Sequence, residues 1–348
     1  MPPTLRALFG IETPIVLGPF GGMSSVALTA AVSRAGGLGS YGLYGYSPER
    51  IARTAAELRA ATDRPFALNL WAPVGDEVRP GEVDIAAARE VVAPLYAELG
   101  LDLPEPPAAF LVDFDAQLAT VLDARPAVAS FVFGLPGPDG ITALHERGIL
   151  VVGTATTVRE AVRVAEAGAD AVVATGLEAG GHRVSFDRAA EDSLIGSIAL
   201  VPQVVDAVGI PVIAAGGIAD RRGVAAAFAL GADGVQVGTA FLRTRQSAAS
   251  DAHRAAIDAA TDTGTVLTRA VTGRLARGIP NRLVRLVEEA GEILPFPAQG
   301  WLLGPVRAEA LRRGLGDLQS LWAGQGAPLA RADDVDDVFA ELAAGVPR

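Results

Sequence analysis

The chain has three histidines, and one of them follows two adjacent glycines in the stretch TGLEAGGHRVSF, residues Thr175–Phe186. This histidine is His182, and Glu178 precedes it by four residues. An imidazole titrates near pH ~6.5, so it can serve as an acid, a base or a hydrogen-bond donor. His182 is therefore a candidate site residue, and a buried structural histidine is the alternative. Glu178 either orients His182 or begins a helix.

A second group of candidate residues lies in PVIAAGGIADRRGVAAAFALGADGVQVGTAF, residues 211–241. Gly216 and Gly217 end one apolar run, and Gly238 and Thr239 end the next, where a helix could begin. Bare backbone N–H groups at such turns can bind phosphate, and a threonine hydroxyl adds a donor. The alternative is that these glycines only allow helices to pack. We favour a binding site for a cofactor that carries a phosphate.

The composition excludes several kinds of enzyme. The chain has no cysteine, and all 29 of its basic residues are arginines. Lysine Schiff bases, thiol nucleophiles and thiolate metal sites are therefore excluded, and we expect no metal. The net charge of −11, without basic clusters, argues against nucleic acid and anionic membranes as partners. No apolar run is long enough to span a membrane. We expect a soluble, cytoplasmic protein whose chemistry comes from an organic cofactor.

The elements that must hold these residues alternate between strands and helices. Short apolar runs without polar alternation are typical of strands buried on both faces of a parallel sheet. Ala-rich segments of helical period, such as residues 157–169 and 220–232, lie between most of them. Eight such units predict a TIM (β/α)8 barrel with its site at the carboxyl ends of the strands, and a doubly wound sheet is the alternative. The eight runs are residues 14–18, 37–42, 65–71, 128–134, 149–154, 170–175, 211–217 and 233–239.

Two intervals are too long for simple connections between strand and helix. Residues 84–100 have a helical pattern and lead into the Pro-rich stretch LDLPEPPAAF, which we expect to be extended. Residues 243–304 follow the last predicted strand and include helices, and we interpret them as an inserted helical cap domain over the barrel mouth. The predicted barrel then comprises residues 1–242 and 305–348. Its last helix lies in DDVDDVFAELAAG, which begins acidic and ends in glycine.

Taken together, these motifs resemble the nitronate monooxygenases, formerly called 2-nitropropane dioxygenases. The resemblance runs from Pro14 to about Gly326 and includes PIVLGPFGGM, DRPFALNLW, GLEAGGHR, TGRLARGIPN and LWAGQG. The family implies an FMN-dependent barrel enzyme that oxidises alkyl nitronates, such as propionate 3-nitronate, with dioxygen to a carbonyl compound and nitrite. Similar motifs occur in FMN-dependent enoyl reductases and NAD(P)H:quinone reductases, so reduction of an enoyl thioester or a quinone is the alternative. A protein that only stores or senses flavin is a third hypothesis.

The resemblance also implies roles for individual residues. His182 would be the catalytic residue, and the glycines before it would pass close to the flavin. An imidazole near a nitronate can donate a hydrogen bond to the anion, or act as a base toward a neutral nitroalkane. The residues implied to bind the cofactor are Gly22, Met23, Asn69, Thr175, Gly180, Gly181, Gly216, Gly217, Gln236, Val237, Gly238 and Thr239.

The sequence departs from the family at two points. Thr175 stands where the family has glutamine, and the lysine that many flavin barrels place near flavin N1 has no counterpart. Arg183 is a candidate for that role, with a solvated arginine as the alternative. Arg274 and Arg277 either line the mouth and attract an anionic substrate or are plain surface charges. We expect the stretch WAGQG, residues 322–326 beginning with Trp322, to lie near the flavin, and a helix-ending turn is the alternative explanation of its glycines. The oligomeric state is open, and a homodimer is one of the alternatives.

Overall fold

Eight parallel strands form the centre of the molecule. The computed structural model describes residues 4–347, and the strand order is β1-β9-β8-β6-β5-β4-β3-β2. The sheet closes on itself because Val16 of β1 bridges Leu38, just before β2. Every strand coincides with a predicted run, with β5 extending one residue beyond its run to Ala155, so the predicted TIM barrel is confirmed. The strands are β1 (Ile15–Leu17), β2 (Gly39–Gly42), β3 (Phe66–Trp71), β4 (Val128–Val132), β5 (Leu150–Ala155), β6 (Ala171–Thr175), β8 (Val212–Ala215) and β9 (Gly234–Val237).

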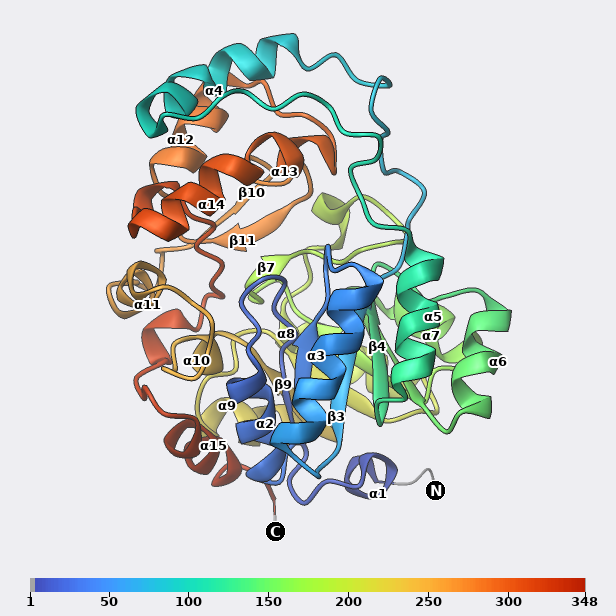
Figure 1. Ribbon diagram of the computed structural model, residues 1–348. Coiled ribbons are helices and arrows are strands. Elements are labelled where there is room, and N and C mark those ends of the chain that lie inside the picture. Colours follow the sequence, from blue (N-terminus) through green and yellow to red (C-terminus); the bar gives the residue numbers. More distant parts are fainter. Residues whose placement is uncertain (1–3, 348) are drawn as a thin grey trace.

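Helices surround the barrel (Figure 1). Several of them begin where a polar side chain accepts a backbone N–H, among them Thr157 before α7, Asp220 before α9 and Asp334 before α15. These three helices were predicted from the sequence. The surrounding helices are α2 (Val26–Arg34), α3 (Pro48–Ala61), α5 (Phe114–Ala124), α6 (Pro138–Glu146), α7 (Val158–Glu166), α8 (Ser197–Ala207), α9 (Arg221–Ala229), α10 (Thr239–Leu242) and α15 (Val335–Ala343), and α1 (Leu5–Phe9) lies at the amino-terminal end of the barrel.

A second hydrophobic core lies over the barrel mouth, at the top of Figure 1. It contains buried side chains of α4 (Ala86–Leu99), α12 (Arg282–Ala290), α13 (Ala298–Leu302) and α14 (Gly304–Arg313). Helix α4 was predicted, and the Pro-rich stretch after it has neither helix nor strand. Helices α4 and α14 share this core although they lie outside the 243–304 range predicted for the cap, and that division of the chain stays a prediction.

A small antiparallel sheet joins the second core to the barrel. Its strands are β7 (Gly181–His182), β10 (Val266–Thr268) and β11 (Ala276–Gly278), in the order β10-β11-β7. Ala276 pairs with His182 and Arg277 with Gly181. The sequence analysis did not predict this sheet. It fixes the backbone at His182 from the side of the second core.

A helix that crosses a bilayer needs about 20 consecutive, mostly apolar residues. Within residues 4–347, no helix is both long and apolar enough to cross a membrane.

Candidate active site

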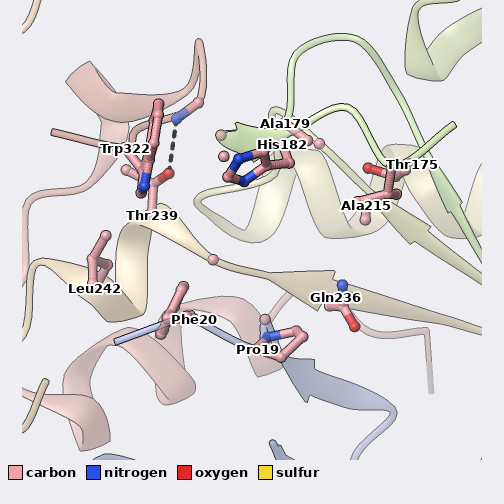
Figure 2. A pocket seen from close by; sticks show the side chains of 18 of the residues that line it. Pro19, Phe20, Thr175, Ala179, His182, Ala215, Gln236, Thr239, Leu242 and Trp322 are labelled. Atoms are coloured by element: carbon pink, nitrogen blue, oxygen red, sulfur yellow. Dashed lines mark hydrogen bonds between the residues drawn. The ribbon is translucent and has the colours of Figure 1, made fainter. Parts of the chain in front are cut away.

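A cavity of about 240 Å³ lies at the carboxyl ends of the barrel strands. The segments after β1, β2, β6, β8 and β9 line it together with side chains of β3, and residues of the late segment 322–326 complete its wall. Figure 2 shows side chains from these separate segments around one space, with His182 and Trp322 on one side and Pro19, Phe20 and Gln236 on the other. The cavity is therefore where the (β/α)8 fold places its chemistry.

The turns after β8 and β9 present backbone donors to this cavity. Gly217, Ile218, Gly238 and Thr239 line it, and no acceptor among residues 4–347 takes a hydrogen bond from their N–H groups. The Thr239 hydroxyl accepts from the Gly324 N–H at 3.0 Å, which ties the late segment to this turn (Figure 2). Unpaired N–H groups at a barrel mouth suit an anion.

His182 faces the cavity from β7. Its Nε2 lies 2.8 Å from the Thr272 hydroxyl, while Nδ1 has no hydrogen-bond partner within the described part of the chain. The ring packs edge-on against Trp71, with 4.8 Å between centroids, and lies 5.4 Å from the ring of Trp322. The imidazole is thus held at one nitrogen and between two indoles, and the other nitrogen is free to contact a bound molecule.

The imidazole of His182 is neutral at physiological pH. Burial is the main cause, and the nearby charges of Arg274 and Arg307 act in the same direction, so that the pKa of His182 falls to about 3. The neutral ring carries one proton, on Nδ1 when the Thr272 hydroxyl donates to Nε2 and on Nε2 when that hydroxyl accepts. With so low a pKa it is a weak base, but it can still donate or accept a hydrogen bond.

Asn69 shows how the barrel strands present polar atoms to the same cavity. Its Nδ2 donates to the carbonyl and to the hydroxyl of Ser130, each at 3.1 Å. The amide oxygen takes no hydrogen bond from residues 4–347 and lines the cavity as an acceptor. An N–H group of a bound molecule could pair with it.

Most of the residues predicted to bind a cofactor are brought together in this cavity. Gly22 and Val237 are not among the lining residues: Gly21 and Met23 line it on either side of Gly22, and the side chain of Val237 is fully buried in the barrel core. The predicted contacts with flavin stay predictions. The predicted residues that line the cavity are Met23, Asn69, Thr175, Gly180, Gly181, His182, Gly216, Gly217, Gln236, Gly238 and Thr239, and Trp322 joins them.

The arginines singled out in the sequence lie elsewhere. Arg183 is 1% exposed and donates to the carbonyls of Gly176 and Ser193, so it is neither solvated nor part of the cavity lining. Arg274 is buried, bonded to Asp76 and Glu77, and does not line the cavity. Arg183 therefore binds backbone carbonyls, and Arg274 forms ion pairs with acidic residues, so both guanidinium groups have structural roles.

Arg277, Glu178 and His253 also have structural partners. Arg277 is buried against the carbonyl of Leu177. The Glu178 carboxylate accepts from the N–H of Ser197 at 2.9 Å, so it begins α8 and has no bond to His182. His253 is buried in α11 (Asp251–Asp258), and its Nε2 lies 2.9 Å from the Trp322 carbonyl.

The sequence analysis missed Arg307 and Tyr44, which both line the cavity. Arg307 lies in α14, within a stretch that reads as an ordinary amphipathic helix. Tyr44 lies in the turn after β2. No motif distinguishes either residue, because their place depends on packing between the second core and the barrel.

Comparison with known proteins places the chain in a family. Residues 3–345 match the nitronate monooxygenase family. The chain is 43% identical to the nitronate monooxygenase of Pseudomonas aeruginosa over 337 residues, covering 93% of each chain. It superposes on the structure of nitroalkane oxidase from Streptomyces ansochromogenes with a TM-score of 0.88 at 38% identity, covering 98% of this chain and 96% of that one. FabK from Thermotoga maritima is also similar, with a TM-score of 0.76, 30% identity and coverage of 98% and 95%.

The fold and the cavity define a barrel enzyme with its site at the strand ends. The chain belongs to the nitronate monooxygenase family, a family of oxidoreductases.

Proposed function

We propose that the chain is an FMN-dependent nitronate monooxygenase, which oxidises alkyl nitronates such as propionate 3-nitronate with dioxygen to a carbonyl compound and nitrite. The observation that carries the proposal is the neutral His182, which faces the same cavity as the unpaired N–H groups of the turns after β8 and β9. One part of the cavity suits a cofactor phosphate, and another suits a small anionic substrate.

The residues present fit FMN. The N–H groups of Gly217, Ile218, Gly238 and Thr239 would hold the phosphate, because they line the cavity without acceptors in residues 4–347. The free Oδ1 of Asn69 would accept from an N–H of the flavin ring. When bound, FMN supplies the electron transfer and the reaction with oxygen.

His182 would bind the nitronate. The Thr272 hydroxyl lies closer to Nε2 of His182, at 2.8 Å, than to the Arg274 carbonyl, at 3.3 Å, so we assign its proton to the bond with His182. The ring proton is then on Nδ1, the nitrogen without a partner in the described chain, and Nδ1–H would donate to a nitronate oxygen. A pKa of about 3 makes the same ring a poor base at neutral pH, so the preferred substrate is the nitronate and not the neutral nitroalkane. Trp71 and Trp322 would hold the ring and exclude water.

The test is anaerobic mixing of the FMN-loaded protein with propionate 3-nitronate and, separately, with NADH or NADPH, followed by flavin absorbance. Bleaching by the nitronate, with nitrite released once air is admitted, is the expected result. Bleaching by the nicotinamide alone would replace the proposal with the reductase alternative, in which an enoyl thioester or a quinone is reduced. A flavin that neither reagent bleaches would favour storage or sensing. A cytoplasmic location and a homodimer stay predictions.

A further inference from the structure

His253 is a buried histidine that the proposed reaction does not use. It lies on α11, is 2% exposed and does not line the cavity. Its Nε2 lies 2.9 Å from the carbonyl oxygen of Trp322, and this is the one hydrogen bond of the ring within residues 4–347. A carbonyl oxygen only accepts hydrogen bonds, so Nε2 carries the proton and donates. The cost of burying the imidazole is therefore offset at a residue of the cavity wall.

The carbonyl of Trp322 depends on this bond. Its neighbours in the chain are held separately: the Leu321 carbonyl accepts a backbone N–H at 2.8 Å, and the Gly324 N–H donates to the Thr239 hydroxyl at 3.0 Å. Within the described part of the chain, His253 is the only donor to the Trp322 carbonyl. This carbonyl faces a buried ring, so without the donor it would be an unpaired acceptor, and its peptide group would turn toward another partner.

The indole of Trp322 lies against His182. The two ring centroids are 5.4 Å apart, and both side chains line the cavity on the same side (Figure 2). The indole also packs on the backbone of β11, since a Cβ at Gly278 would lie 3.0 Å from its Cε3. Close packing leaves the ring little room to adjust by itself. A turn of the Trp322 peptide group would therefore move the indole relative to His182.

A role in anchoring α11 does not account for this histidine. The helix begins at Ser250, whose hydroxyl accepts from the backbone N–H of His253 at 3.1 Å and donates to the side chain of Gln319. Ile257, one turn further along the helix, is fully buried in the core. An apolar side chain at position 253 would anchor the helix at a lower cost of desolvation. The imidazole N–H therefore serves the Trp322 carbonyl.

We propose that His253 is a positioning residue, which acts through the Trp322 carbonyl to fix the indole against His182 and thereby sets how tightly the cavity binds its substrate. The identity of the substrate rests on the proposed function, whereas the placement of the rings is a property of the folded protein. No hydrogen bond joins His253 to the turns after β8 and β9 within residues 4–347, so FMN binding should not depend on it.

Three variants separate the hydrogen bond from the packing. His253→Phe keeps an aromatic ring but has no donor. His253→Gln keeps a donor, because the amide Nε2 of glutamine lies as many bonds from Cα as Nε2 of histidine. Ile257→Val is the matched control: it removes a buried methyl group from the same helix and leaves the bond to Trp322 intact. If His253→Phe does not fold, His253→Asn replaces it, because its amide is one bond shorter and falls short of the carbonyl.

The first readout is the NMR spectrum of the histidine rings in the FMN-loaded protein, without substrate. The chain has three histidines, so their ring resonances can be resolved, and those of His145, which is partly exposed and bonded to Asp170, serve as a reference. The indole beside His182 shifts the resonances of that ring. We expect these resonances to move in His253→Phe, to return toward their wild-type positions in His253→Gln, and to stay in place in Ile257→Val.

The second readout is steady-state oxidation of propionate 3-nitronate. We expect the KM of His253→Phe to rise by about 5- to 30-fold, the equivalent of one hydrogen bond, with kcat within about 3-fold of wild type. His253→Gln and Ile257→Val should both keep a KM near the wild-type value. The Kd of FMN should be the same in all four proteins.

The outcomes decide the proposal in both directions. Shifted His182 resonances and a raised KM in His253→Phe, both reversed in His253→Gln, support it. Resonances that do not move in His253→Phe would overturn it, and so would equal changes in Ile257→Val, since the helix as a whole would then be responsible. Moved resonances with an unchanged KM would also overturn it. If the wild-type protein does not oxidise the nitronate, the proposed function fails, and the NMR comparison alone decides whether His253 positions the indole.

Discussion

Gly238→Ala separates cofactor binding from folding. A Cβ at this position would meet only Cε1 of Phe20, at 3.5 Å, which is an ordinary van der Waals distance. The backbone has φ −106°, which alanine tolerates. Phe20 lines the cavity, so the added methyl group points into it, beside the N–H groups of Gly238 and Thr239. We expect the folded protein to be as stable as wild type, or more stable by up to about 1 kcal/mol through the loss of glycine's freedom in the unfolded chain.

The same methyl group should weaken FMN binding. A phosphate held by these two N–H groups would be displaced, and a hydrogen bond to a charged group contributes about 1.5–3 kcal/mol. The loss of one such bond corresponds to a rise of about 10- to 150-fold in the Kd of FMN. Titration of the flavin-free protein with FMN, followed by flavin fluorescence, measures this change. Riboflavin has no phosphate, so its Kd should stay near the wild-type value.

Gly209→Ala is the matched control. Gly209 lies in an exposed turn with no atom within 4 Å of the added Cβ and no positive φ, and it is not among the residues that line the cavity. Both alanine variants should unfold at or above the wild-type temperature, and only Gly238→Ala should lose FMN. If Gly238→Ala bound FMN with wild-type affinity, the phosphate would not lie at the turn after β9, and this reasoning would be refuted.

Three further predictions concern groups near the cavity. His182→Ala should retain FMN and lower nitronate kcat/KM by about 10- to 150-fold, the contribution of one hydrogen bond to an anion, and unchanged steady-state turnover would contradict its role. Because burial lowers the pKa of His182 to about 3 and that of His253 to about 4, both rings should stay neutral at pH 5 in an NMR titration. In the unfolded chain an imidazole binds a proton below pH ~6.5, whereas these two rings stay neutral in the folded protein. The free energy of unfolding should therefore fall as the pH drops below that value, by up to about 1.4 kcal/mol per pH unit for each ring. Denaturant melts at several pH values measure this fall. Glu178→Ala removes the acceptor that begins α8 and should lower the free energy of unfolding by about 0.5–2 kcal/mol without changing the pH dependence of turnover, and a shifted pH profile would mean that Glu178 acts on His182.

The barrel could be predicted because its strands leave a strong local signal. Strands such as β5 and β6 are buried on both faces, so their sequences are apolar throughout and end at glycine or polar residues. The turns after β8 and β9 carried a similar signal, since Gly216 and Gly238 directly follow these strands. Strand β7 has only two residues, and its partner β11 lies far along the chain, so no local pattern could reveal it.

The charged residues of the site could not be assigned from the sequence. Arg183 is adjacent to His182 in sequence, yet it turns away from the cavity toward buried carbonyls. Arg274 finds its acidic partners about two hundred residues earlier in the chain. Arg307 lines the cavity without an acidic partner among residues 4–347, and the absence of such a contact leaves no motif in the sequence. Charge balance in the cavity is therefore knowable only from the folded structure.

The hydrogen bond from the Gly324 N–H to the Thr239 hydroxyl bears on the order in which the site forms while the chain is being synthesised. Trp322 and Gly324 complete a wall of the cavity, although they are translated long after the barrel strands. Domains generally begin to fold from the amino terminus during synthesis, so the barrel can form while this wall is still absent. The nascent chain would then offer an open, unfinished binding site. Tight capture of the cofactor should therefore follow the synthesis of Trp322 and Gly324 and their emergence from the ribosome.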